Sequence, residues 1–148
     1  MSGNVKKEFG DYQTPLDFCY RVCNYIKESR LAEDAAAIME PTCGVGNFLL
    51  AASNTFACSK LIGIEVNAKR ADAARIEVPS ATIETNDIFN VSTKTLCGED
   101  CVLVIGKPPW ATNSELSFNL PPKTNFKGLR GIEAITGSSN FDICEYII

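Results

Sequence analysis

The sequence predicts a doubly wound α/β domain built on a mostly parallel sheet. Four short segments of the kind that form strands, most of them apolar, alternate with segments that are typical of helices. Strands that alternate with helices favour a parallel sheet wound by right-handed crossovers. Polar or glycine-containing segments follow these runs at their carboxyl ends, where sheets of this kind bind ligands. The length of 148 residues suits one domain.

The elements can be assigned in order along the chain. Thr14 and Pro15 are typical of a helix start, with Thr14 as the N-cap, and apolar residues then recur at helical spacing over 16–26. Strands are predicted at 35–39, 61–66, 81–84 and 101–105. Two more helices are predicted at 48–58 and 67–76, and Asn67 would cap the helix at 67–76. Residues 141–148 resemble the opening of an amphipathic helix, so we expect a sheet that is incomplete at its C-terminal end.

The amino-acid composition limits the catalytic chemistry that the chain can carry out and the cellular compartment that we expect for it. The chain has no histidine, which removes histidine acid–base catalysis and most zinc sites, and we expect no metal. Seven cysteines without a secretory signal indicate a reducing, cytoplasmic setting with buried free thiols. No apolar run reaches the ~20 residues that span a bilayer. A net charge of −4 argues against nucleic-acid binding by the whole surface, although residues 107–131 are locally basic.

A glycine turn follows the first predicted strand. Gly44 and Gly46 would let the backbone approach a ligand closely at a helix start. The turn lacks the third glycine of a dinucleotide fingerprint, because Leu49 stands there. Glu65, after the second strand, could accept hydrogen bonds from ribose hydroxyls, and Asp87, after the third, from the amine of an adenine. Each residue also fits an ordinary role as a tight turn, a surface acid or a helix cap.

The tetrapeptide Lys107-Pro108-Pro109-Trp110 follows the fourth predicted strand. Its prolines fix φ and remove backbone donors, so neighbouring carbonyls stay free to accept hydrogen bonds. Trp110 offers a flat face on which a planar ring can stack. This layout is typical of a pocket for a nucleobase or planar amide whose amine reacts.

Five segments, taken in their order along the chain, match the motifs of a known protein family. They are Phe9-Gly10-Asp11-Tyr12-Gln13-Thr14-Pro15, Glu40-Pro41-Thr42-Cys43-Gly44-Val45-Gly46-Asn47-Phe48, Ile64-Glu65-Val66-Asn67, Asn86-Asp87-Ile88-Phe89 and Gly106-Lys107-Pro108-Pro109-Trp110. The set resembles the S-adenosylmethionine-dependent adenine-N6 DNA methyltransferases of restriction–modification systems. The resemblance implies a Rossmann-like methyltransferase fold, with 1–148 as a truncated catalytic domain, 1–34 as its N-terminal helical segment and no target-recognition domain.

The resemblance also implies roles for individual residues around S-adenosylmethionine. Trp110 would stack on a flipped-out target base, and the Pro108 carbonyl would accept one hydrogen of its amine. The catalytic loop would be Lys107, Pro108, Pro109 and Trp110, and the cofactor would be bound by Tyr12, Thr14, Pro15, Glu40, Pro41, Cys43, Gly44, Gly46, Phe48, Glu65, Asp87, Ile88 and Phe89. Within that set, Tyr12, Thr14 and Pro15 would line the methionine end, Glu65 the ribose, and Asp87 with Ile88 or Phe89 the adenine.

Lys107 departs from the family pattern, which has Asn, Asp or Ser at this position. A lysine ammonium has three donors and no acceptor for the amine of the target base. It would also repel a sulfonium cation by about 4 kcal/mol at ~4 Å in an intermediate dielectric. We therefore expect a catalytically dead or severely impaired enzyme. The expected partners are DNA, bound weakly by this chain alone, a C-terminal or specificity subunit, and a restriction endonuclease.

Other interpretations stay open at this point. A cofactor-binding module without chemistry, or one half of a split enzyme, would fit the unusual Lys107. A protein-glutamine or RNA amino-methyltransferase would fit a Pro-Pro-aromatic loop, which suits any planar amine. A nicotinamide dehydrogenase would use the glycine turn and Glu65, but it gives the loop at 107–110 no task.

Overall fold

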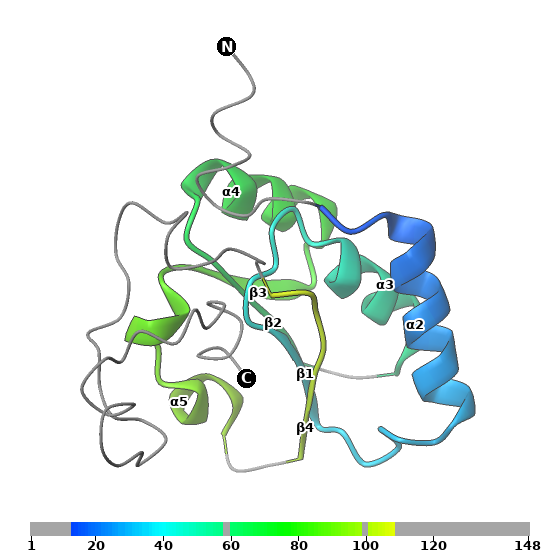
Figure 1. Ribbon diagram of the computed structural model, residues 1–148. Helices are drawn as coiled ribbons and strands as arrows, with labels where there is room; N and C mark the ends of the chain where they lie inside the picture. The colour runs from blue at the N-terminus through cyan, green and yellow to red at the C-terminus, as the bar shows by residue number, and fades with distance from the viewer. Residues whose placement is uncertain (1–12, 58–59, 99–100, 109–148) are drawn as a thin grey trace, which may run out of the picture. The chain divides into compact units, whose positions relative to one another are not determined.

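The computed structural model describes residues 13–57, 60–98 and 101–108 of the chain (Figure 1). Residues 13–107 form one compact unit, and Pro108 belongs to a second unit whose other residues lie outside the described ranges. None of the helices in the described ranges has the length and apolarity that crossing a bilayer requires.

A parallel sheet forms the centre of the unit, which confirms the prediction from the sequence. Within the described residues its strands pair in the order β3-β2-β1-β4, and every pairing is parallel. The winding reverses after β3, because β4 pairs with β1 on the side away from β2. In such sheets a ligand binds beside the carboxyl ends of the strands at the point of reversal. The strands are β1 Ala37–Glu40, β2 Lys60–Glu65, β3 Ala81–Thr85 and β4 Val102–Val104.

The longer helices pack on one face of this sheet. Alternate strand residues, among them Ile38, Leu61 and Ile83, join helix residues in one apolar core. Cys19 and Cys23 are fully buried in the same core, one helical turn apart. The helices are α2 Leu16–Glu28, α3 Asn47–Thr55 and α4 Ala68–Glu77, close to the predicted bounds.

The opposite face is covered, within the described residues, by two short elements that the sequence did not predict. They are the 3-10 helix η1, Ile88–Asn90, and the helix α5, Thr93–Cys97. Cys97 lies in a second core with Met39, and their sulfur atoms are 3.4 Å apart. Five residues are too few for a helical period to be visible, although Ser92 was an available start signal.

Two predicted helix caps have different outcomes. The Asn67 Oδ1 atom accepts hydrogen bonds from the backbone N–H groups of Lys69 and Arg70, so the cap of α4 is confirmed. The predicted Thr14 cap of α2 is wrong, because Pro15 holds the N-cap position and no side-chain hydrogen bond is made there. The helix expected at 141–148 lies outside the described residues.

Candidate functional site

The predicted glycine turn lies at the carboxyl end of β1, and its shape requires both glycines. Gly44 and Gly46 have φ angles of +55° and +89°, in the left-handed region that favours glycine. A Cβ atom on Gly44 would lie 2.5 Å from Gln13 Oε1, and one on Gly46 would lie 3.3 Å from the Cβ of Ala74. The preceding residue, Cys43, donates its N–H to the Ile64 carbonyl, 2.8 Å away, which ties the turn to β2. The turn is thus held close to both the sheet and α4.

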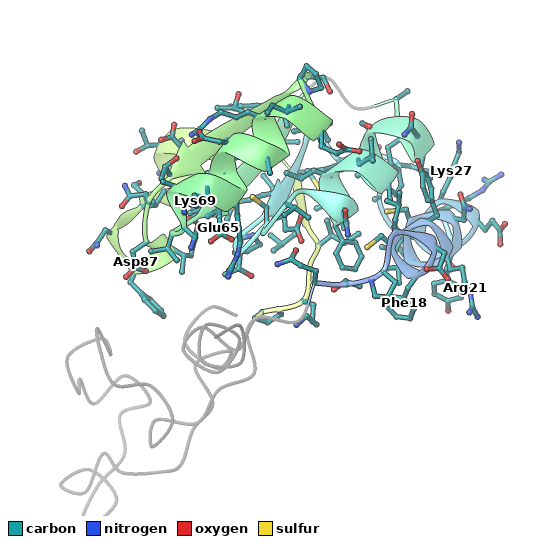
Figure 2. All side chains as sticks on the ribbon, turned by 90° about the horizontal axis from the view of Figure 1, so that it is seen from above. Phe18, Arg21, Lys27, Glu65, Lys69 and Asp87 are labelled. Carbon is teal, nitrogen blue, oxygen red and sulfur yellow. The ribbon has the colours of Figure 1, made fainter. Side chains whose placement is uncertain are left out.

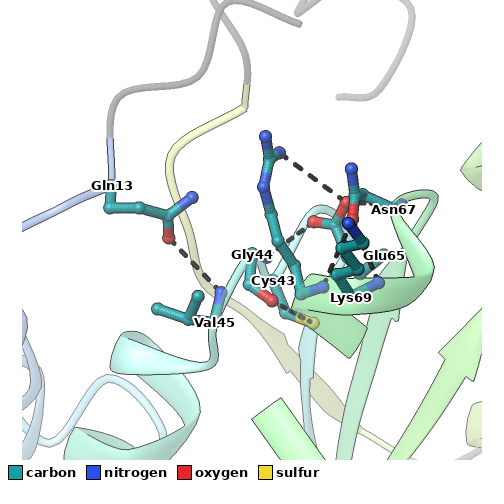
Figure 3. Close-up of polar contacts among 8 residues, drawn as sticks. Gln13, Cys43, Gly44, Val45, Glu65, Asn67 and Lys69 are labelled. Carbon is teal, nitrogen blue, oxygen red and sulfur yellow. Dashed lines mark hydrogen bonds and ion pairs between the residues drawn. The ribbon is translucent and has the colours of Figure 1, made fainter. Parts of the chain in front are cut away.

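Glu65, at the carboxyl end of β2, is fixed by hydrogen bonds to both carboxylate oxygens (Figure 3). Its Oε2 accepts the N–H of Gly44 and its Oε1 accepts the N–H of Asn67, each at 2.8 Å. The Arg70 guanidinium lies 4.0 Å from Oε1. Glu65 is only 6% exposed. Because a carboxylate offers about four lone-pair sites, this acid can still accept hydrogen bonds from a ligand.

Glu40, the last residue of β1, is a second buried carboxyl group in the same region. It is 4% exposed, and its Oε2 atom has no hydrogen-bond partner among the described residues. Burial raises its pKa well above the ordinary value, the backbone hydrogen bond from Leu49 opposes this in part, and the Glu65 charge adds to it. The Gly106 backbone lies against it, since a Cβ there would be 3.1 Å from Glu40 Cγ. A buried oxygen without a partner favours a ligand that brings a donor or a positive charge.

Buried thiols surround this carboxyl group and stay protonated. Burial, reinforced by the Glu40 charge, raises the pKa of Cys19 to about 12 and that of Cys23 to about 11. The same causes raise the pKa of Cys43 further. These thiols are therefore poor nucleophiles. The described cysteines are all free, and within the described residues no group of three or more acidic or cysteine side chains could hold a metal ion.

The segment before α2 contacts the glycine turn through two amide side chains. Val45 donates its N–H to Gln13 Oε1 at 3.3 Å (Figure 3). Asn47 Nδ2 donates to the Thr14 carbonyl at 2.8 Å. Thr14 therefore lies beside the turn through its backbone. The sequence assigned no role to the side chain of Gln13 or of Asn47, because neither an amide before a helix nor one at a helix start carries a pattern that identifies its partner.

Asp87, after β3, acts as the cap of η1. Its Oδ1 accepts the N–H of Phe89 at 3.1 Å. Ile88 packs against the second core and is only partly buried, as is Phe89. Figure 2 has Glu65 and Asp87 on one side of the molecule, and Phe18 of α2 on the other. Asp87 therefore has the ordinary role of a helix cap through its bond to the Phe89 N–H, and its second carboxylate oxygen takes no part in that bond.

Some of the remaining predicted site residues lie in the described parts of the chain and others do not. Pro41, Cys43 and Phe48 lie in or next to the glycine turn, and Pro15 lies at the start of α2. Lys107 is partly buried and follows Gly106, the residue that contacts Glu40. Pro108 belongs to the second unit. Tyr12, Pro109 and Trp110 lie outside the described residues.

Two solved structures share this arrangement of strands and helices. One, assigned as an RNA methyltransferase from Pyrococcus horikoshii, matches with a TM-score of 0.55 and 15% identity, over 72% of this chain and 51% of that one. Another, assigned as a class I S-adenosylmethionine-dependent methyltransferase from Listeria monocytogenes, matches with a TM-score of 0.53 and 14% identity, over 82% of this chain and 37% of that one. At such identities the likeness concerns the fold alone, and it confirms the Rossmann-like methyltransferase fold.

Comparison with known protein sequences shows which methyltransferases the chain resembles in sequence. No family model matches the chain. It is 39% identical to the type II methyltransferase M.NspV of Nostoc sp., a match that covers 100% of this chain and 34% of M.NspV. It is 33% identical to the type II methyltransferase M.CvrRI of Paramecium bursaria Chlorella virus XZ-6E, over 76% of this chain and 27% of that protein. The chain is thus a relative of the type II methyltransferases, which confirms the resemblance to restriction–modification enzymes, and it spans about a third or less of their lengths.

Proposed function

We propose that this chain forms the cofactor-binding part of an S-adenosylmethionine-dependent DNA methyltransferase that acts on the N6 amine of adenine. The observation that carries the proposal is the joining of Glu65 to the Gly44 amide at the carboxyl end of the sheet. This bond fixes an acid next to a turn that admits close approach of a ligand. The similarity to type II methyltransferases along the whole chain supports DNA as the substrate.

The residues around the turn fit S-adenosylmethionine by their chemistry. Glu65 would accept hydrogen bonds from the ribose hydroxyls through the lone pairs that Gly44 and Asn67 leave free. Glu40 would lie beneath the cofactor, where its unpartnered oxygen favours a cationic ligand over an anionic one. When bound, the cofactor would supply the methyl group.

The adenine of the cofactor would lie near the start of η1. Asp87 has one carboxylate oxygen outside the bond to Phe89, and this oxygen would accept a hydrogen of the exocyclic amine. The partly buried side chains of Ile88 and Phe89 would contact the ring. The methionine end would lie beside Thr14 and Pro15, and the Asn47 side chain holds the Thr14 carbonyl next to the turn.

The loop after β4 would receive the target base. The Pro108 carbonyl would accept one hydrogen of its amine and Trp110 would stack on the ring. Lys107 has no acceptor for the second hydrogen, so the nitrogen lone pair would be left unaligned. Loss of one positioned polar contact commonly costs ~10²–10³ in rate. We therefore infer that the enzyme is severely impaired or inactive.

A calorimetric titration with S-adenosylhomocysteine tests the cofactor site. We expect saturable binding that Glu65→Ala weakens by at least about tenfold, because two hydrogen bonds to a charged acceptor are lost. Glu77→Ala is the matched control, since Glu77 is an exposed acid at the end of α4, and it should bind as the unaltered chain does. Equal binding by both variants would refute the role of Glu65.

A cofactor-binding module without chemistry is the second candidate, and Lys107 is the observation that favours it. The two candidates differ in the effect of Lys107→Asn on a protein that includes the regions which the relatives have beyond this chain. An impaired methyltransferase would gain transfer of labelled methyl groups to duplex DNA. A module without chemistry would stay inactive while binding the cofactor normally. Supplying RNA or a glutamine-containing peptide as the methyl acceptor in the same assay tests whether RNA or protein, rather than DNA, is the substrate.

A further inference from the structure

All three backbone N–H groups of the glycine turn have acceptors within the protein. The Gly44 N–H donates to Glu65 Oε2 at 2.8 Å, and the Val45 N–H donates to Gln13 Oε1 at 3.3 Å. The Gly46 N–H donates to the Cys43 carbonyl at 2.8 Å. In glycine turns that bind phosphate, such N–H groups point at the anion instead. This turn therefore offers a phosphate none of its usual donors.

Gln13 lies directly against the turn. A Cβ atom on Gly44 would be 2.5 Å from Gln13 Oε1 and 2.9 Å from Gln13 Nε2, so the side-chain amide occupies the space next to this glycine. The adjoining Thr14 carbonyl is held by Asn47 Nδ2 at 2.8 Å, which fixes the backbone that carries Gln13. The Gln13 side-chain amide therefore lies beside the turn, and its oxygen holds the Val45 N–H.

Glu65 closes the other side of the turn with its carboxylate group. Its carboxylate holds the Gly44 amide, and it lies in the same region as the buried Glu40. Like charges at close range disfavour an anionic ligand. Gln13 differs from these acids because its side chain is neutral and exposed.

We propose that Gln13 is a specificity-determining residue that withholds the Val45 amide from phosphate and so selects adenosine ligands without phosphate groups. The inference rests on the proposed function only in taking an adenosine ligand to bind at this turn. Its chemistry is a competition for one N–H donor between the Gln13 carbonyl oxygen and a phosphate oxygen.

Affinity ratios test this selectivity. For the 148-residue chain and Gln13→Ala, the dissociation constants of S-adenosylhomocysteine and of ADP are measured by calorimetry. We expect Gln13→Ala to improve ADP binding relative to S-adenosylhomocysteine by about threefold or more, the usual effect of one neutral hydrogen bond. Gln13→Glu keeps the acceptor and adds a charge, so it should shift the ratio in the opposite direction. Asn54→Ala, which removes an amide that donates to the Tyr20 hydroxyl on the outer side of α3, is the matched control and should leave the ratio unchanged.

A second readout separates failure of this inference from failure of the proposed function. Inorganic phosphate is titrated into ¹⁵N-labelled protein while the Val45 amide resonance is followed. We expect phosphate to shift this resonance in Gln13→Ala and to leave it unmoved in the unaltered chain and in Asn54→Ala. An unresponsive Val45 amide in Gln13→Ala, or an unchanged affinity ratio, overturns the proposal. Loss of S-adenosylhomocysteine binding in a folded, unaltered chain would instead overturn the proposed function, and the phosphate titration would still decide the role of Gln13.

Discussion

Replacing Glu40 by glutamine should remove a pH-dependent loss of stability. Glu40 is 4% exposed with one unpartnered oxygen, so its charged form is costly in the folded state. Its folded-state pKa lies well above the ordinary value of 4.5, which it keeps in the unfolded chain. The unfolded chain therefore releases the Glu40 proton first as the pH rises.

The sign and size of the effect follow from linkage. Between the unfolded and the folded pKa the folded state binds more protons, so stability falls as the pH rises, by at most ~1.4 kcal/mol per pH unit for one group. Below about pH 4.5 the group is protonated in both states and its contribution levels off. The glutamine side chain that replaces Glu40 would be neutral at every pH and could still accept the Leu49 backbone hydrogen bond. We therefore expect Glu40→Gln to gain stability relative to the unaltered chain as the pH rises from about 4 to 7.

Urea unfolding at several pH values measures this directly. The free energy of unfolding of the unaltered chain and of Glu40→Gln should be similar near pH 4 and diverge toward about pH 7. Glu77→Gln, at an exposed acid, should follow the unaltered chain throughout. Parallel pH profiles for the unaltered chain and Glu40→Gln would contradict this prediction, because Glu40 would then not be a costly buried charge.

Three further results are expected. Gly44→Ala should lower the free energy of unfolding by roughly 1–2 kcal/mol and so unfold at a lower urea concentration, because φ at this position is +55° and the added Cβ would meet Gln13. An unchanged urea midpoint would contradict the turn geometry. Asn67→Ala should lose about 1 kcal/mol in the same assay through loss of the α4 cap, whereas retention of full stability would mean that the cap contributes nothing. Brief alkylation under native conditions, read by mass spectrometry, should modify the exposed Cys101 and spare the buried thiols, and their modification before unfolding would contradict the burial given for Cys19, Cys23 and Cys43.

Most of the described fold could be predicted from the sequence because local patterns and packing agree. The buried part of β2, Leu61 to Ile64, is a continuous apolar run, and Asn67 stands where a helix needs a cap. The short helix α5 was missed, because five residues carry no visible period. Thr14 was assigned as a cap from residue type alone, whereas Pro15 takes the position and the Thr14 backbone contacts Asn47 instead.

The site was predictable at its charged and glycine positions and not at its amide side chains. Glu65 was placed correctly at the carboxyl end of a strand, because strand ends meet at one edge of a parallel sheet. The sequence did not reveal that Glu65 binds the Gly44 amide, nor that Gln13 binds Val45. Such contacts join residues far apart in the chain, and they depend on side-chain conformations that only the folded structure fixes.

A crystal structure of the chain with S-adenosylhomocysteine tests most directly whether the glycine turn and Glu65 bind the cofactor. We expect ribose hydroxyls within about 2.6–3.2 Å of the Glu65 carboxylate oxygens, beside a glycine turn whose amides keep their protein acceptors. A ligand bound elsewhere, or a ribose turned away from Glu65, would contradict the assignment of this turn as the cofactor site.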